Sequence, residues 1–393
     1  MATYKEQNKL NVPHLRFPEF HGEWEKCKLG DIAEFSTARV SSVKLDCKNY
    51  VSTENMLQDF QGVVEAKSVP NETNVISFTC GDILISNIRP YLKKVWKATF
   101  DGGCSSDVFV LQATDTVAKD YLHYAVANDK FINYVMSGAK GVKMPRGDKN
   151  QMRTYQLSLP SIQEQYKIAK LLTLLDERIA TQSKLIEDLK KLKSAIIDYA
   201  INSHDTDFVK FGSLYEMAGE GGTPTTSNAS FYDNGKIPFI KIDDLKKKYL
   251  TKNKDFITEL GLQKSSAWLV PTRSILFSNG ATIGEITITT YPVCTKQGIL
   301  GIVPKPNIDV EFLYYFMSSS YFKKAVSRIV TEGTMKTVYL KDINNIRCPI
   351  PTKEKQLDIA KMPSALNSKI DFEQSILKLF GSQKQYLLRQ MFM

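Results

Sequence analysis

The sequence has few histidines and none of the spacings typical of metal ligands. Its histidines are His14, His21, His123 and His204. None belongs to an HExxH pair or to a Cys/His cluster of the kind that holds zinc. His123 matches Tyr314 in the internal repeat described below, which favours a packing role. The sequence therefore predicts no metal site in this chain.

Motifs for phosphate binding and catalysis are also missing. The sequence has no GxxxxGK[ST] loop and no glycine-rich cofactor fingerprint after a predicted strand. The glycine-rich loop 219–224 ends in Pro224 without a following Lys-Ser/Thr pair, which argues against a nucleotide site. Neither an Asn-Pro-Pro-aromatic methyltransferase motif nor a nuclease-like Asp…Glu-x-Lys set is present. We therefore expect a chain without catalysis or a cofactor of its own; a catalyst hidden in one half is the alternative.

Paired cysteines and long hydrophobic runs are absent as well. Six cysteines are scattered without a CxxC pair, as is typical of free thiols in a reducing cytoplasm. No apolar run approaches the roughly 20 residues that span a bilayer. The first twenty residues lack the apolar core of a signal peptide. The sequence therefore predicts a cytoplasmic protein with no membrane partner.

Positive charge is in excess. Lysine and arginine number 52 against 42 aspartates and glutamates, for a net charge of +10. Clustered cations favour a polyanionic partner because they release counterions from phosphates. Charge alone does not distinguish such a protein from a basic protein that binds no nucleic acid.

The chain contains a long internal repeat. The segment LPSIQEQYKIAKLLTLLDERI begins at Leu159, and IPTKEKQLDIAKMPSALNSKI begins at Ile350. Pro160 matches Pro351 without a gap, at an offset of 351 − 160 = 191. Upstream, Ile83-Leu84-x-Ser86-Asn87 matches 275–279 at an offset of 192, while the stretches between matched segments diverge. Solenoid units are about 20–50 residues long, so the repeat indicates two whole domains: one scaffold that carries two different surfaces.

Each copy ends in a predicted long helix. Ser161 and Glu164 have the spacing of a capping box, and apolar residues then recur at steps of four and three, as in a coiled coil. The first apolar seam comprises Ile168, Leu172, Leu175, Ile179, Ile186 and Leu189, and the second comprises Ile359, Leu366, Ile370 and Leu377. Two amphipathic helices must bury their stripes. We therefore expect them to pair as an antiparallel coiled coil with pseudo-twofold symmetry.

Both seams contain irregular positions. Gln182 and Glu373 interrupt the two seams at the same place. These polar residues either fix the register or lie at the wet edge of the seam, and the sequence does not choose between the two. Pro363 lies on the second seam and Gly381 follows it, so we expect a bend or a break near Pro363.

The globular parts mix short strands with one predicted helix each, which indicates an α+β fold. Strands are expected at 82–85, 108–111, 275–277 and 298–303, and helices near 120–136 and 310–330. The predicted boundaries are an N-terminal extension (1–23), a first domain (24–160), a first long helix (161–206), a second domain (207–351) and a second long helix (352–393).

Loops rich in cations, glycine, serine and asparagine are the candidate nucleic-acid contacts. In the first domain the candidates are Arg89, Lys93, Lys94, Lys143 and Arg146; in the second they are Thr225, Thr226, Lys241, Arg273 and Lys336. Such loops supply phosphate contacts that position a protein and base contacts that specify a sequence. A solvated surface is the alternative for any single lysine among them.

Five segments together resemble the specificity subunit of type I restriction-modification enzymes. They are the two repeated segments above, RFPEFHGEWEKCKLGDIAEFSTA from Arg16, GGTPTTSNASFYDNGKIPFIKIDDL from Gly221 and the terminal LLRQMF from Leu387. Each motif is loose, but their order and duplication are specific, and the resemblance covers essentially the whole chain. Pro363 and Gly381 depart from the pattern and put the straightness of the second spacer helix in doubt.

The resemblance implies a DNA-binding adaptor without catalysis. In this family two target-recognition domains each recognise half of a bipartite, asymmetric DNA site, and the spacer helices fix the gap. The helices also dock two methyltransferase subunits, which bind S-adenosylmethionine, while motor-nuclease subunits use ATP. The competing hypothesis is a structural coiled-coil adaptor that binds nucleic acid nonspecifically.

Overall fold

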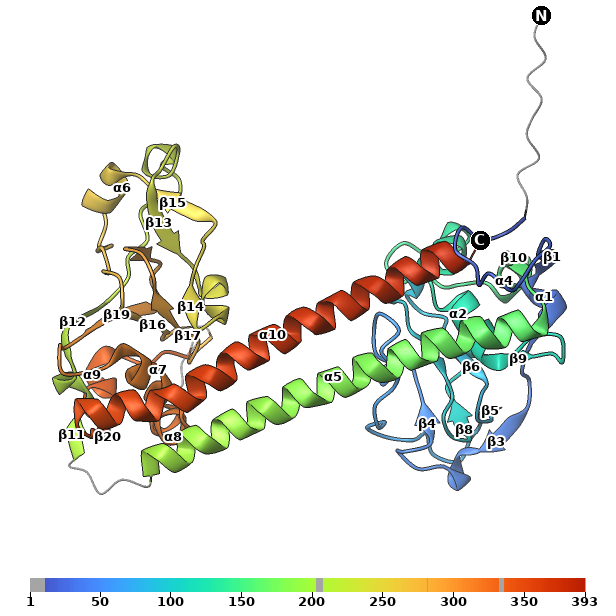
Figure 1. The fold of residues 1–393 in the computed structure, drawn as a ribbon, viewed down its shortest axis with the longest axis horizontal. Helices are drawn as coiled ribbons and strands as arrows, with labels where there is room; N and C mark the ends of the chain where they lie inside the picture. The colour runs from blue at the N-terminus through green and yellow to red at the C-terminus, as the bar shows by residue number, and fades with distance from the viewer. Residues whose placement is uncertain (1–10, 203–207, 281, 332–335, 393) are drawn as a thin grey trace, which may run out of the picture. The chain divides into compact units, whose positions relative to one another are not determined.

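The computed structural model describes residues 11–202, 208–280, 282–331 and 336–392 (Figure 1). The chain divides into two compact units. Unit 1 comprises Met1–Gln182 and Ile376–Met393, and unit 2 comprises Ser183–Ser375. Each unit therefore contains a globular domain and a part of both long helices. Both units mix helices with sheets, which confirms the predicted α+β class.

Unit 1 is built on two four-stranded sheets. The first has the strand order β2 (Ala33–Phe35), β9 (Val108–Ala113), β6 (Ile83–Ser86), β7 (Val95–Lys97), and all its neighbours are antiparallel. The second has the order β3 (Arg39–Ser41), β5 (Asn74–Phe78), β8 (Gly102–Cys104), β4 (Tyr50–Val51), with β4 and β8 parallel. The strands β1 (Glu25–Lys28) and β10 (Gln156–Leu159) form a separate antiparallel pair.

The first sheet of unit 1 has hydrophobic side chains on both faces. In β6, Ile83 and Ile85 pack into one core while Leu84 packs into another. Strand side chains alternate between faces, so a sheet covered on both sides needs a continuous apolar run. This explains why the segment Ile-Leu-Ile stands out in the sequence.

Unit 2 repeats this scaffold, with one added strand in its main sheet. Its main sheet has the order β12 (Tyr215–Glu220), β19 (Ile299–Pro304), β16 (Ile275–Ser278), β17 (Ile286–Thr289), β14 (Tyr249–Leu250). The first four strands correspond to β2-β9-β6-β7. A second sheet contains β15 (Asp255–Ile257), β13 (Ile237–Ile240) and β18 (Cys294–Thr295), and β11 (Phe208–Lys210) pairs with β20 (Arg347–Pro349). The second sheets differ in strand number, in agreement with the divergent sequences there.

The prediction of one helix per domain is wrong, because two short helices stand in its place in each unit. In unit 1 they are α2 (Lys119–Val126) and α3 (Asp129–Ser137); in unit 2 they are α7 (Val310–Ser318) and α8 (Ser320–Ile329). The Asn128 side chain accepts a hydrogen bond from the Phe131 amide, and the Ser319 side chain accepts one from the Phe322 amide. Each side chain caps a new helix start, so the chain turns between the two helices.

The remaining short helices connect the strands. In unit 1 they are α1 (Leu29–Ile32), α4 (Lys149–Arg153), η1 (Ser42–Lys44) and η2 (Pro90–Leu92). In unit 2 they are α6 (Glu259–Gln263), α9 (Leu340–Ile343), η3 (Phe211–Ser213), η4 (Ala229–Phe231) and η5 (Ile242–Lys246).

The long helices are α5 (Ile162–Asn202, 41 residues) and α10 (Lys353–Met391, 39 residues) (Figure 1). At 1.5 Å per residue each is roughly 60 Å long. In unit 1, Asp176 pairs with Lys384 at 2.6 Å, and the Arg178 guanidinium lies 5.6 Å from the Phe380 ring centroid. Residue numbers rise on one helix as they fall on the other, so the pairing there is antiparallel. In unit 2, Lys193 Nζ donates to Asn367 Oδ1 at 3.0 Å.

These inter-helix contacts are equivalent in the repeat. Lys384 minus Lys193 and Asn367 minus Asp176 both give 191. The same pair of positions therefore meets in both units, as an ion pair in unit 1 and as a neutral-acceptor hydrogen bond in unit 2. Pseudo-twofold symmetry requires that positions 191 residues apart make the same contact in each unit, and these two contacts meet that requirement.

The seam residues are buried to differing degrees. Those that are buried are Ile168, Leu172, Leu175, Ile186 and Ile370; those that are half-buried are Ile179, Leu189, Ile359, Leu366 and Leu377. Glu373 is only 5% exposed and forms an ion pair with Lys369, so it does not lie at a wet edge. Gln182 is half-buried.

Of the bend or break expected near Pro363, the break is wrong, because α10 is continuous through Pro363 and through Gly381. Proline removes one hydrogen bond and costs about 3 kcal/mol in a helix interior. Pro363 is buried, and Ala360 and Ile370 are buried one turn before it and two turns after it. This packing on both sides offsets the lost bond and holds the helix together.

Only half of the predicted capping box forms at the N-terminus of α5. Ser161 Oγ accepts the Glu164 amide at 3.4 Å, as expected. The Glu164 carboxylate, only 1% exposed, instead accepts two hydrogen bonds from the Arg16 guanidinium, both at 2.8 Å. The segment 11–23, expected to be an extension, is thus tied to unit 1 through a buried ion pair.

Candidate nucleic-acid interface

Two segments that are distant in sequence form one basic surface in unit 1. We call the loop 87–94, which follows β6, the Asn87 loop, and the segment 140–146 the tip hairpin. Within the hairpin the Lys140 and Arg146 backbones exchange two hydrogen bonds of 3.0 and 2.9 Å. The Arg89 amide donates to the Pro145 carbonyl at 2.8 Å, and the Gly147 amide donates to the Asn87 carbonyl at 3.1 Å. Backbone bonds therefore fix the hairpin against the loop.

Unit 2 repeats this arrangement. The Val338 amide donates to the Asn279 carbonyl at 2.9 Å, and Asn279 Nδ2 donates to the Val338 carbonyl at 3.1 Å. Thr331 and Thr337 form the bridge that matches Lys140 and Arg146, again at an offset of 191. Residues 281 and 332–335 of unit 2 lie outside the described residues. Among the described residues, the base of the loop after β16 and the base of the second tip are therefore joined as in unit 1.

All five candidates of the first domain belong to this surface. Arg89 and Lys93 adopt left-handed backbone conformations, with φ of 52° and 53°, on either side of η2. Such conformations cost of order 1–3 kcal/mol in non-glycine residues and cluster at functional sites. Lys143 and Arg146 lie on the tip hairpin and are exposed. Sequence reasoning grouped these residues by charge, and the structure brings them together.

The cations of this surface differ in their partners. Lys93 pairs with Asp129 at 2.8 Å, and Arg146 pairs with Asp107 at 2.9 Å. Lys94 Nζ donates to the Thr53 carbonyl at 2.6 Å; burial first, and the positive charge of Arg89 second, lower the pKa of Lys94. In the described part of the chain, the buried Nε of Arg89 has no hydrogen-bond partner. Because this atom is closed to solvent, a ligand cannot reach it in this structure.

The candidates of the second domain are more dispersed. Thr225 and Thr226 are exposed in the loop after β12, and Lys241 pairs with Asp255 at 2.7 Å. Arg273 precedes β16 and Lys336 lies by the loop that follows it, on the rim of a cavity of about 380 Å³. A four-residue strand spans roughly 13 Å. The structure therefore does not bring Arg273 and Lys336 together.

Sequence reasoning missed the apolar part of the tip hairpin. Val142 is fully exposed and Met144 is 50% exposed, between the cations of the same loop. The available signal was two hydrophobic residues inside the glycine-rich, basic stretch GAKGVKMPRG. Charge drew attention to its lysines and arginines alone.

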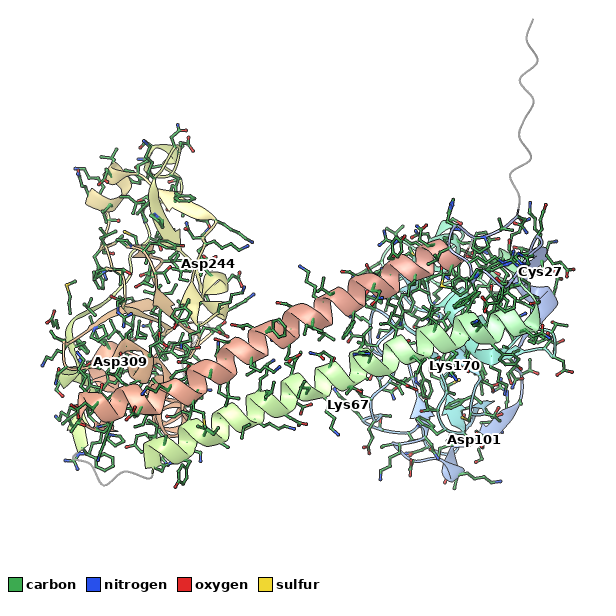
Figure 2. All side chains as sticks on the ribbon, viewed as in Figure 1. Cys27, Lys67, Asp101, Lys170, Asp244 and Asp309 are labelled. Atoms are coloured by element: carbon green, nitrogen blue, oxygen red, sulfur yellow. The ribbon has the colours of Figure 1, made fainter. Side chains whose placement is uncertain are left out.

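One glutamine in each unit joins the globular domain to the long helix that follows it, and the two glutamines are equivalent in the repeat. Gln165 Oε1 accepts the Ala118 amide at 2.9 Å, and its Nε2 donates to the Thr116 and Pro160 carbonyls at 3.4 and 3.0 Å. Gln356 makes the same three bonds, to Asp309, Asn307 and Pro351, at 2.8, 3.4 and 2.9 Å. Figure 2 labels Asp309 at the start of α7. Both glutamines are 1% exposed, so each joint is rigid and equivalent.

A second joint shows how the copies have diverged. Tyr124 bonds to Thr173 at 3.3 Å, and its counterpart Tyr315 bonds to Ser364 at 3.1 Å. The cation beside Tyr315 is Lys248, which donates to the Tyr315 hydroxyl at 2.8 Å and forms an ion pair with Glu311. In unit 1 the cation over the Tyr124 ring is Lys384, at 5.7 Å. Lys248 also lies 4.6 Å from the Tyr315 ring centroid, so a cation lies over both rings while the residue that supplies it has changed.

The described residues offer no other site of a recognisable class. No group of three or more His, Cys, Asp or Glu side chains that could hold a metal ion occurs among them. Burial raises the pKa of Cys294 to about 11 and that of Cys104 to about 12, so neither is an activated thiolate. No helix in the described ranges is long and apolar enough to cross a membrane.

The two-unit fold and the matched joints between domain and helix define a class that comparison with known proteins makes explicit. The family model of the type I restriction modification DNA specificity domain matches residues 21–191 and again residues 204–379. The chain belongs to this family. The two matches also confirm the tandem repeat of target-recognition domains.

Individual relatives agree with this assignment. The chain is 24% identical over 413 residues to the type I restriction enzyme MjaVIII specificity subunit of Methanocaldococcus jannaschii, covering 95% of this chain and 92% of that one. It is 33% identical over 115 residues to the HindI specificity subunit of Haemophilus influenzae, covering 29% of this chain and 25% of that one. The crystal structure of the type I restriction-modification S subunit from M. genitalium has the same fold, with a TM-score of 0.59 at 16% identity over 97% of this chain and 99% of that one.

Proposed function

We propose that this chain is the DNA-recognition adaptor of a type I restriction-modification complex and that it recognises a bipartite, asymmetric site. The repeated loop-and-hairpin surface carries this proposal. In both units, equivalent bonds join the described bases of these two segments, while the sequences of the segments differ. Two different surfaces on one repeated scaffold suit two different half-sites.

DNA contact is supported by the chemistry of the unit 1 surface. Exposed cations such as Lys143 and Arg146 suit phosphates, which supply most of the affinity of DNA-binding proteins. Arg89, half-buried on the same surface, adds a further positive charge. In the proposed complex these groups position the first domain and supply part of its base recognition.

The outer faces of the long helices suit protein partners. The exposed large hydrophobic residues are Tyr166, Leu174, Leu185, Leu192 and Tyr199 on α5, and Leu357, Met362, Phe372, Leu379 and Tyr386 on α10. The steps Leu185–Leu192–Tyr199 and Phe372–Leu379–Tyr386 are each seven residues. A heptad stripe outside the seam fits a further helix. We propose that methyltransferase subunits dock here and that motor-nuclease subunits complete the complex.

The proposed chemistry resides in those partners. Methyl transfer would use S-adenosylmethionine bound by the methyltransferase subunits, and cleavage would use ATP bound by the motor-nuclease subunits. This chain would bind neither cofactor and would set only where its partners act.

Mapping methylated adenines tests the proposal. Plasmid DNA carrying random inserts is exposed to this chain together with its methyltransferase partner, and the modified positions are sequenced. We expect one bipartite motif with two different half-sites and a gap of fixed length. A control without this chain should show no motif. Methylation scattered without a motif would instead support the coiled-coil adaptor that binds nucleic acid nonspecifically.

A further inference from the structure

The end of the tip hairpin is apolar, although its surroundings are basic. Val142 is fully exposed and Met144 is 50% exposed, while Lys143 between them is exposed too. Single exposed hydrophobic residues are common. Two of them on one protruding turn form surface that gains free energy when a partner covers it, at about 25 cal/mol per Å².

The hairpin presents these side chains from a fixed frame. Its base is closed by the paired backbone bonds of Lys140 and Arg146, and it is anchored to the Asn87 loop by two more. Gly141 has a φ of +100°, which a residue with a side chain rarely adopts, and this permits the tight turn. The backbone at the base of the turn that carries Val142 and Met144 is therefore fixed before any ligand arrives.

The charges around the tip indicate which partner covers it. The cations are Arg89, Lys140, Lys143 and Arg146, and the acidic groups that face them are Asp107 and Asp148. Arg146 is paired with Asp107 at 2.9 Å, whereas Lys140 is 4.0 Å from Asp148 and largely exposed. The local excess is positive, which favours a polyanion over an apolar protein surface.

Duplex DNA offers one apolar group to such a tip. The major groove is about 12 Å wide and accommodates a two-stranded β-ribbon, and the 5-methyl group of thymine projects into it. The other base edges in that groove carry hydrogen-bond donors and acceptors. An apolar tip between cations thus matches thymine methyl groups between phosphates.

We propose that Val142 and Met144 recognise a thymine methyl group in the half-site bound by unit 1. This assignment rests on the proposed function and deepens it, because it names side chains that determine specificity. It requires that this half-site contain at least one A·T pair.

The test is a double-mutant cycle that combines a side-chain substitution in the protein with removal of a methyl group from the DNA. Each thymine of the mapped half-site is replaced in turn by deoxyuridine, which lacks only that methyl. With the unaltered chain and its methyltransferase partner, at least one replacement should weaken binding about fourfold, the equivalent of one buried methyl group. In V142S or M144S the same replacement should have no further effect. V43S is the matched control, since Val43 is 73% exposed but lies on η1, and it should retain the fourfold loss.

The outcomes separate the two proposals. A clear bipartite motif whose deoxyuridine variants bind like thymine would overturn the thymine assignment alone. The same holds if V142S and M144S retain the full deoxyuridine effect, or if the half-site has no A·T pair. Failure to obtain any motif would reject the proposed function, and this assignment with it.

Discussion

One position shows how a single residue difference between the copies changes a physical property of the fold. His123 in unit 1 occupies the place of Tyr314 in unit 2. Burial, followed by the positive charges of Lys384 and Lys97, lowers the pKa of His123 to about 4, against the opposing effect of Asp176 and Asp120. The packing role expected for this histidine agrees with its half-buried position. Tyr314 carries no charge to lose near neutral pH, so the two copies should differ in acid.

The first prediction concerns the stability of unit 1 in mild acid. The folded-state pKa of His123 lies below the ordinary value of 6.5, so the unfolded chain takes up a proton that the folded chain refuses. Stability should fall as pH drops from about 6.5 and should have lost roughly 3 kcal/mol by pH 4. Guanidinium unfolding of the unaltered chain and of His123→Tyr, at pH 7 and pH 4.5, measures how much unfolding free energy each protein loses in acid.

The comparison of the two proteins isolates the histidine. Carboxylates titrate in both, so only the difference between them belongs to residue 123. The tyrosine variant should lose less stability on acidification. Equal losses would mean that His123 is protonated in the folded state or that its surroundings open in acid.

At the scale of elements, the sequence predicted local features well and non-local ones poorly. The strand cores around Ile83 and Ile275 were predicted because continuous apolar runs need two covered faces. The split between α2 and α3 was missed although Asn128 was visible as a capping residue, because the apolar pattern continues across it. The pairing of the Asn87 loop with the tip hairpin joins residues about 55 apart, which no local pattern reveals.

The second prediction concerns the tip hairpin as a phosphate contact. Lys143→Ala and Arg146→Ala should each weaken DNA binding and lower the salt slope of log K by about one unit per lost phosphate contact. Titrations of a mapped DNA site between 50 and 200 mM salt, a range in which such contacts are measurable, give both quantities. Arg146→Ala should show the smaller effect, since its pairing with Asp107 already neutralises part of its charge.

Lys170 provides the control for these variants. It is exposed on α5 (Figure 2), an element that does not include the Asn87 loop or the tip hairpin, so Lys170→Ala should leave the slope unchanged. Unchanged affinity and slope in both hairpin variants would remove Lys143 and Arg146 from the interface.

At the scale of the whole molecule, the repeat was the most informative feature of the sequence. The offset of 191 predicted two copies of one domain, and Gln165 and Gln356, which it aligns, make equivalent hydrogen bonds in the two units. The sequence could not predict that α10 continues through Pro363, because that depends on how much packing surrounds the proline. It also could not assign individual cations such as Arg273 to the interface, because the position of a side chain on a loop depends on the conformation of that loop.

The central proposal, which the family resemblance implies, is that the two long helices set the gap between the two half-sites. Matching seven-residue insertions, one between Gln182 and Ser183 and one between Ser375 and Ile376, would keep the heptad phase of both helices. They would lengthen each helix by about 10 Å, or about 3 base pairs of duplex. Methylation mapping should then yield the same two half-sites with a longer gap. An unchanged gap between unchanged half-sites would contradict the account.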